Sequence, residues 1–490
     1  MARHPAAPAA RAPRHVRIAA ASKARYLFAC PMTERLTSLI CGTEPMNAVW
    51  SPRATLQRML DVEAALARAS AAHGVIPRTA VAAIAEACQA DRLDAGALAR
   101  DAALGGNLAI PLVKQLTARV KDIDPEASKY VHWGATSQDI IDTATVLQLR
   151  DSLALIEAGL DALCATLAGL ARAHRSTPAV GRTWLQQALP VTLGLKFAQW
   201  LDALLRHRER LAALREHALV LQFGGAAGTL ASLRAAAADV SATLAQELAL
   251  AQPTLPWHTQ RDRIAEAAAF FGMLIGTLGK IARDISLQMQ TEVGELAEPA
   301  AAGKGGSSTM PHKRNPVGCA AVLTAAARAP GLVATVFGGM VQEHERALGG
   351  WQAEWDALPD LARLAGGALA HIGQIAGGLE VRPERLAANL DATQGLILGE
   401  AVMLALGDAI GRLDAHHLVE QASKTAVQTG RTLYDVLAAN PAVTQHLDAA
   451  RLKALLDPAN YTGEAHAFVD AVLASNAKRA APSSSQTHEE

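Results

Sequence analysis

Residues 145–175 read TVLQLRDSLALIEAGLDALCATLAGLARAHR, and this stretch decides the fold. Its leucines recur every three or four residues, which is the spacing of one face of an α-helix. A helix of this length extends about 45 Å at 1.5 Å per residue. Two similar stretches follow at 193–221 and 261–290, and another is predicted to begin near Val317. Helices this long and this apolar predict a bundle in which more than one face of each helix is buried.

The composition also predicts an all-α protein. Half of the 490 residues are hydrophobic, only 4% are aromatic, and alanine and leucine, which favour helices, dominate.

The spacing of apolar residues and of glycine and proline predicts five segments. They are a disordered extension or misread start at 1–31, an N-terminal helical domain at 32–140, a central long-helix bundle at 141–372 that includes the loop 303–316, a C-terminal helical domain at 373–475 and a disordered tail at 476–490. The apolar stripes of the bundle are too wide for one partner helix. We therefore expect a homo-oligomer.

The charge balance excludes several classes of partner. Lys plus Arg equals Asp plus Glu at 46 each, so no overall field attracts nucleic acid or a membrane surface. The apolar stretch 265–282 contains Glu266 and Lys280, and we interpret it as a core helix and not a membrane span.

The cysteines are widely spaced, odd in number and without a CxxC pair: Cys30, Cys41, Cys88, Cys164 and Cys319. This pattern suggests neither disulfides nor a metal site, and it favours the reducing cytoplasm.

One loop, GKGGSSTMPHKRNP at 303–316, concentrates glycine, serine, basic residues and proline. A phosphate-binding P-loop would need glycine where Glu298 stands and Ser or Thr where Gly305 stands, so this interpretation fails. Glycines confer mobility and prolines limit it, which is typical of a hinged lid. A merely solvated basic loop would not need this mixture.

Two further segments precede long helices. In HWGATSQDIIDTA, from His132, the pair Thr136 and Asp139 forms a capping-box pattern, which places hydroxyls and amides at the positive end of a helix, where carboxylates bind. The alternative is a capped helix without a ligand. In GRTWLQQALP, from Gly181, the polar residues could serve only packing and capping. A second capping box is predicted at Thr259 and Asp262, with no chemistry assigned to it.

The loop GGSSTMPHKRNP resembles the signature loop of the fumarase/aspartase superfamily, and HWGATSQD and GRTWLQQA are similar to its other two active-site segments, in the same order. The resemblance covers roughly 32–475. It implies three all-α domains, with a twenty-helix core in a homotetramer and each active site built from three subunits. It also implies cofactor-free chemistry, in which a base removes a proton beside a carboxylate to give an aci-carboxylate.

The second segment departs from the superfamily pattern, which has histidine where this chain has Trp184. That histidine helps to protonate the leaving group, but a carboxylate with a pKa near 4 leaves readily as the anion. The departure fits the lactonising branch of the superfamily, which closes a carboxymuconate to a lactone in bacterial protocatechuate degradation. The stretches at 134–151, 256–266 and 343–355 are also similar to that branch. The implied substrate is a small tricarboxylate.

The resemblance implies a set of site residues. The catalytic group is Ser307, Lys313, Asn315 and His132. The substrate-binding group is Thr136, Ser137, Thr183, Trp184, Gln187, Ser308, Met310 and Arg346. His132 and His312 are further possible donors to the substrate carboxylates, whereas Lys304 and Arg314 are expected to be solvated surface charges.

Two alternatives remain open at this point. One is an adenylosuccinate-lyase-like β-elimination enzyme, although residues 345–351 read ERALGGW and lack the serines expected there for a nucleotide phosphate. The other is a non-catalytic structural protein on the same scaffold, although the retention of Ser307, Lys313 and Asn315 speaks against it.

Overall fold

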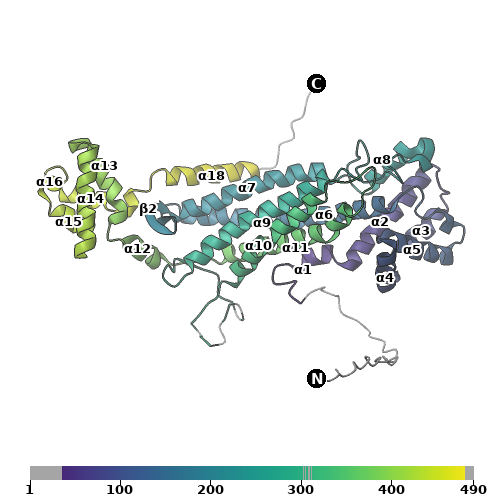
Figure 1. The fold of residues 1–490 in the computed structure, drawn as a ribbon, viewed down its shortest axis with the longest axis horizontal. Helices are drawn as coiled ribbons and strands as arrows, with labels where there is room; N and C mark the ends of the chain where they lie inside the picture. Colours follow the sequence, from purple (N-terminus) through teal and green to yellow (C-terminus); the bar gives the residue numbers. More distant parts are fainter. Residues whose placement is uncertain (1–35, 302, 304, 307–308, 311, 481–490) are drawn as a thin grey trace, which may run out of the picture.

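The computed structural model describes residues 36–480 apart from 302, 304, 307, 308 and 311. The molecule is elongated, with a bundle of long helices between a unit of short helices at each end (Figure 1). The mostly helical architecture confirms the predicted all-α class.

The N-terminal unit consists of shorter helices: α1 (Glu44–Val49), α2 (Pro52–Ala72), α3 (Ala80–Ala87), α4 (Ala95–Gly105) and α5 (Ala109–Ile123). Ser51 caps α2, since its hydroxyl accepts a hydrogen bond from the Ala54 N–H, and Pro52 occupies the first helical position. The α2 helix packs against α6 of the bundle, which joins this unit to the rest of the molecule.

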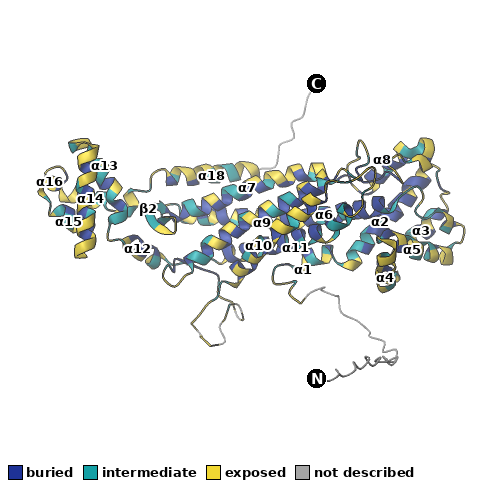
Figure 2. Cartoon of the chain, in the orientation of Figure 1, coloured by how far each residue is buried: buried dark blue, intermediate teal, exposed yellow. Residues whose placement is uncertain are grey.

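The central bundle contains the long helices that the leucine spacing predicts. They are α6 (Ser137–Ala173), α7 (Leu193–Ala218), α9 (Asp262–Gln288), α10 (Val317–Gly338) and α11 (Gly350–Gly377), with the shorter α8 (Ala237–Glu247) beside α2. Figure 2 shows their facing sides as buried and their outer sides as exposed. The core includes Phe197, Phe270 and Phe271, each almost inaccessible to solvent.

Three helices of the bundle, α6, α9 and α10, are long and apolar enough to cross a membrane by length and composition. In this structure they pack within the bundle: α6 against α7 and α11, α9 against α10 and α11. The stretch 265–282 lies inside α9, where Phe271, Leu274 and Leu278 are buried.

Two short two-stranded antiparallel sheets accompany the helices. Strands β1 (Pro178–Thr183) and β2 (Gln186–Thr192) form one, directly between α6 and α7. Strands β3 (Leu296–Ala297) and β4 (Glu380–Val381) form the other, beside the lid. The segment GRTWLQQALP is therefore a hairpin.

The C-terminal unit has its own small core around Val402, Leu406 and Leu433. Its helices are α12 (Pro383–Asp391), α13 (Gly399–Ile410), α14 (Arg412–Thr429), α15 (Leu433–Ala438), α16 (Pro441–Thr444) and α17 (Ala449–Leu455). The last helix, α18 (Ala465–Ala480), returns to the bundle and packs along α7 (Figure 1). The helix extends past residue 476, so the boundary predicted for a disordered tail is too early; residues 481–490 lie outside the described residues.

Candidate active site

The predicted site residues form two groups at opposite ends of the bundle. His132, Thr136, Ser137 and Arg346 lie at the start of α6, whereas the hairpin that carries Trp184 follows the end of the same helix. With 37 residues, α6 is about 55 Å long. The lid lies at the hairpin end, since Arg182 of β1 is paired with Glu295 just before the lid.

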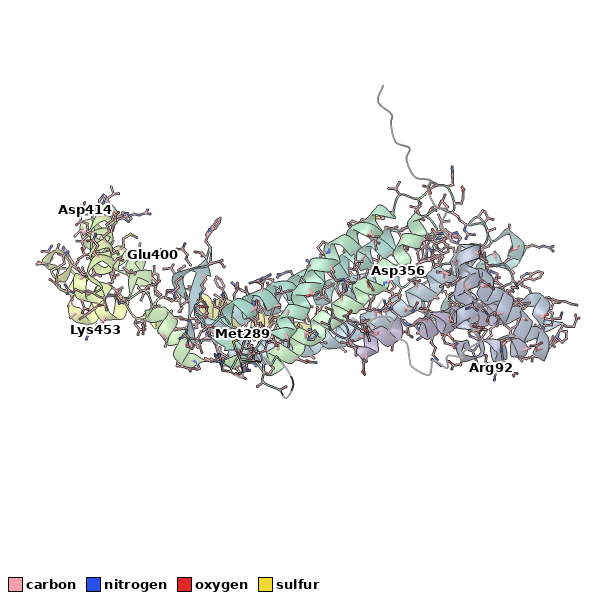
Figure 3. The ribbon with its side chains drawn as sticks, turned by 60° about the horizontal axis from the view of Figure 1, so that its bottom comes forward. Arg92, Met289, Asp356, Glu400, Asp414 and Lys453 are labelled. Carbon is pink, nitrogen blue, oxygen red and sulfur yellow. The ribbon has the colours of Figure 1, made fainter. Side chains whose placement is uncertain are left out.

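Figure 3 shows the same separation along the bundle. The labelled Met289 follows α9 at the lid end, and the labelled Asp356 lies in the early turns of α11, at the other end. Predicted residues Thr183, Gln187, Met310, Lys313 and Asn315 belong to the hairpin and lid end. Ser307 and Ser308 lie outside the described residues.

The first group is built on the capped N-terminus of α6, which confirms the predicted capping box. The Thr136 N–H donates to Asp139 Oδ2 at 2.9 Å. Asp139 also accepts from the Gly224 and Gly225 N–H groups at 3.0 and 2.9 Å. The Arg346 guanidinium donates to the Thr136 hydroxyl. A positive helix end with an arginine beside it is an arrangement that binds a carboxylate.

His132 lies in the turn just before this helix and contacts a buried carboxylate. Its Nδ1 is 2.6 Å from Oε1 of Glu63, which belongs to α2 and is 2% exposed. Burial lowers the pKa of His132, but the attraction and hydrogen bond of Glu63, with a contribution from Asp139, raise it more. The pKa of His132 therefore lies above its ordinary value, which favours the imidazolium.

The structure also reveals buried polar residues that the sequence analysis missed. Arg261 is 2% exposed and binds two carboxylates, Asp142 at 2.7 and 3.1 Å and Glu354 at 3.0 and 2.6 Å. The Trp351 indole N–H donates to Asp142 at 2.9 Å. These contacts join Arg261, the residue before α9, to the early turns of α6 and α11, at the end of α6 that carries Thr136.

A second buried pair lies directly under the cap of α6. His258 Nε2 is 2.7 Å from Asp139 Oδ1, and both side chains are almost inaccessible. The predicted capping box at Thr259 and Asp262 is wrong, because Arg261 is the residue before α9 and the Thr259 hydroxyl donates to the His344 carbonyl at 3.0 Å. A signal was present: Asp139 and Asp142, three residues apart on an apolar helix, require buried partners.

The second group includes the β1–β2 hairpin, whose two-residue tip is Trp184 and Leu185. Their φ angles are 54° and 65°, which is the left-handed conformation that such turns normally give to Asn or Gly. The Trp184 side chain is 96% exposed in the single chain. Two residues before Trp184, Arg182 fixes the hairpin near its tip, since it makes a two-bond ion pair with buried Glu295 at 2.9 and 2.6 Å.

The lid is closed at its base by contacts between its two ends. Glu298, before the lid, accepts hydrogen bonds from the N–H groups of Gly318 and Cys319 at 3.2 and 2.8 Å, which caps α10. Arg314 donates to the Glu298 carbonyl and makes two bonds of 2.8 Å to Glu380 of β4. The expectation that Arg314 is only a solvated charge is therefore wrong; Lys304 lies outside the described residues.

The backbone conformation of the lid requires glycine at position 305. The Asn315 N–H donates to the Gly305 carbonyl at 2.8 Å. Gly305 has a φ of +67°, and a β-carbon there would lie 2.5 Å from the Asn315 carbonyl oxygen. Lys313 and Met310 are exposed, and the Lys313 N–H donates to the Met310 carbonyl at 3.0 Å. Over the described part of the chain, no three His, Cys, Asp or Glu side chains are grouped as metal ligands.

Comparison with known proteins places this geometry in a family. A family model described as "Lyase" matches residues 41–331, and one described as "Adenylosuccinate lyase C-terminus" matches residues 395–472. A 3-carboxy-cis,cis-muconate cycloisomerase of Pseudomonas aeruginosa is 56% identical over 430 residues, or 88% of this chain and 94% of that protein. A nitrosuccinate lyase of Streptomyces davaonensis is 46% identical over 443 residues, or 89% and 93%.

A solved structure agrees with these relatives. The crystal structure of 3-carboxy-cis,cis-muconate lactonizing enzyme from Pseudomonas putida matches with a TM-score of 0.88 and 52% sequence identity, covering 91% of this chain and 100% of that chain. The chain therefore belongs to the lyase family of the fumarase/aspartase superfamily.

Proposed function

We propose that this chain is a cycloisomerase that closes 3-carboxy-cis,cis-muconate to 4-carboxymuconolactone without a cofactor. The observation that carries the proposal is that the chain has both a helix end suited to a carboxylate, at Thr136 and Arg346, and a tryptophan at position 184. The superfamily has a proton-donating histidine at that position. Relatives 56% and 52% identical that carry this activity in their names support it.

The proposed reaction converts the tricarboxylate trianion to a lactone dianion with uptake of one proton, which Ser307 supplies and regains from solvent. One substrate carboxylate attacks a carbon of the double bond, and the π electrons move into the neighbouring carboxyl group to give an aci-carboxylate. Lys313 and Asn315 stabilise this dianion, and Ser307 donates a proton to the adjacent carbon. Because the group that is added is a carboxylate, no acid is required at position 184.

We also propose that the working unit is a homotetramer with shared sites. The start of α6 and the hairpin are about 55 Å apart in one subunit, so a single substrate cannot touch both. A second copy running in the opposite direction would bring its Thr183, Trp184 and Gln187 to the His132, Thr136, Ser137 and Arg346 of the first, and a third copy would supply the lid. Exposed apolar side chains support such packing, among them Met273 of α9 and Phe337 of α10, each 47% exposed.

The cytoplasm is the proposed compartment. Cys41, Cys88, Cys164 and Cys319 are all free thiols in the described part of the chain, which suits a reducing environment.

A second candidate is a β-elimination lyase acting on a succinate derivative, favoured by the 46% identity to a nitrosuccinate lyase. The two reactions are separated by ultraviolet absorbance. If the wild-type protein consumes the conjugated diene of 3-carboxy-cis,cis-muconate and the Ser307→Ala variant does not, the cycloisomerase is supported. Inertness toward this substrate with production of fumarate from nitrosuccinate would overturn it.

A further inference from the structure

Glu63 is a buried acid that the mechanism above does not use. It lies on α2 among apolar residues such as Leu60 and Leu66, and it is 2% exposed. His132 is the hydrogen-bond partner that the structure gives it within the described residues. A charged carboxylate is costly to bury unless a cation or strong donor faces it, so Glu63 and His132 depend on each other.

The backbone conformation of His132 indicates that the surrounding structure enforces this contact. His132 has a φ of 59°, in the left-handed region that residues with a β-carbon avoid. Such a conformation persists where the surroundings hold it. With Nδ1 directed at Glu63, Nε2 is the ring nitrogen left for a ligand.

The charges around the imidazole are mostly negative. Glu63 from α2 and Asp139 from α6 both favour its protonated form. Asp139 is itself paired with His258, so Glu63 is the carboxylate that is hydrogen-bonded to His132. Arg346, which binds Thr136, is the nearby cation of the same group. A second fixed cation would suit a substrate with three carboxylates.

We propose that Glu63 is a positioning residue that holds His132 as an imidazolium, so that its Nε2–H binds a substrate carboxylate and does not transfer a proton in the reaction. The inference rests on the proposed function, because it assigns the role of one residue in that site. A charge that contacts the carboxylate equally before and during the reaction lowers KM and leaves kcat nearly unchanged.

The kinetic test compares Glu63→Gln, Glu63→Asp and the control Glu86→Gln, a glutamate of the same unit with a side chain 58% exposed. Glutamine can still accept from Nδ1–H but no longer stabilises the cation. We expect Glu63→Gln to raise KM about tenfold or more at pH 8 with kcat within about threefold, and the KM defect to shrink toward pH 6, where imidazole is protonated without help. Glu63→Asp and Glu86→Gln should stay near wild type. A fall in kcat at unchanged KM, or no effect, would overturn the proposal.

A calorimetric test does not depend on turnover and remains decisive if Glu63→Gln folds poorly. Propane-1,2,3-tricarboxylate is titrated into the wild-type protein at pH 7.5 in buffers of different ionisation enthalpy. A histidine that is already charged takes up no proton, so binding should be independent of the buffer. Uptake of about one proton by the wild type, or no binding of the tricarboxylate, would contradict the role given to Glu63. Failure to lactonise with buffer-independent binding would instead overturn only the proposed function.

Discussion

Thr136 caps the first turn of α6, and Thr183 lies in the strand that follows the opposite end of the same helix. The two residues belong to the same predicted active site, yet one rigid helix of 37 residues separates them. Arg182, the neighbour of Thr183 on β1, is paired with Glu295 just before the lid, so the lid lies at the Thr183 end. A small substrate could not contact both residues of one subunit.

The buried ion pairs of Arg261 should stabilise the end of the bundle that carries Thr136. Arg261→Met would leave the carboxylates of Asp142 and Glu354 buried without a cation, and we expect a loss of about 3–5 kcal/mol. Urea-induced unfolding measures it. The matched control is Arg68→Met, whose partly exposed pair with Glu247 should contribute at most about 1 kcal/mol. Equal losses for both variants would contradict this ranking.

Two lid glycines offer a matched pair. Gly303 and Gly305 both have positive φ angles, but a β-carbon at Gly303 meets no described atom within 4 Å, whereas one at Gly305 meets the Asn315 carbonyl. We expect Gly305→Ala to lower kcat/KM by about tenfold or more and Gly303→Ala by less than about threefold. Steady-state kinetics on both variants decides the point. A larger defect at Gly303 would mean that the lid adopts another conformation in the working enzyme.

His207 should make stability depend on pH. Burial lowers its pKa to about 4, with Arg210 and Arg206 adding to the effect. A histidine whose folded pKa lies below its unfolded value of about 6.5 is destabilising once the unfolded chain binds the proton, so stability falls as pH drops from about 6.5 toward 4. Thermal unfolding should show a shallower decline over this range in His207→Gln. Parallel curves for the two proteins would show that other groups dominate.

Trp184 tests the explanation for the missing histidine. If the added group is a carboxylate, Trp184→His should not speed lactonisation, and Trp184→Phe should retain more activity than Trp184→His because the position requires an apolar surface. The measurement is the rate of carboxymuconate loss per amount of folded protein. A faster histidine variant would show that protonation at this position limits the reaction.

The long helices were predictable because their signal is local. The apolar spacing predicted α7, α9 and the end of α6 to within about three residues, and the end of the lid loop predicted the start of α10. The start of α6 lies eight residues before the leucine-spaced stretch and was indicated by the Thr136 cap. The Thr136–Asp139 cap was predictable for the same reason. By contrast, the Arg261 network joins residues 93 and 119 positions apart, so it depends on packing that no short motif records. The hairpin was missed because Trp184 and Leu185 occupy turn positions where Asn and Gly are usual.

The pairing of His132 with Glu63 was also beyond sequence reasoning. The two residues are 69 positions apart, and the contact exists only because α2 packs against α6. The resemblance implied His132 as a site residue, and its contact with Glu63 follows from the tertiary fold.

The most direct test of the shared site uses two variants, each defective at one end of the bundle. Arg346→Ala changes the proposed carboxylate-binding end and Lys313→Ala changes the proposed lid, and we expect each variant alone to be nearly inactive. Subunits of the two variants are mixed in equal amounts, dissociated in mild denaturant and reassembled, and the rate of carboxymuconate loss is measured. If each site draws these residues from different subunits, random reassembly gives about one site in four with both residues intact, and activity should recover to about a quarter of wild type. Mixed tetramers that form but remain as inactive as the parents would show that each site lies within one subunit, which would contradict the account.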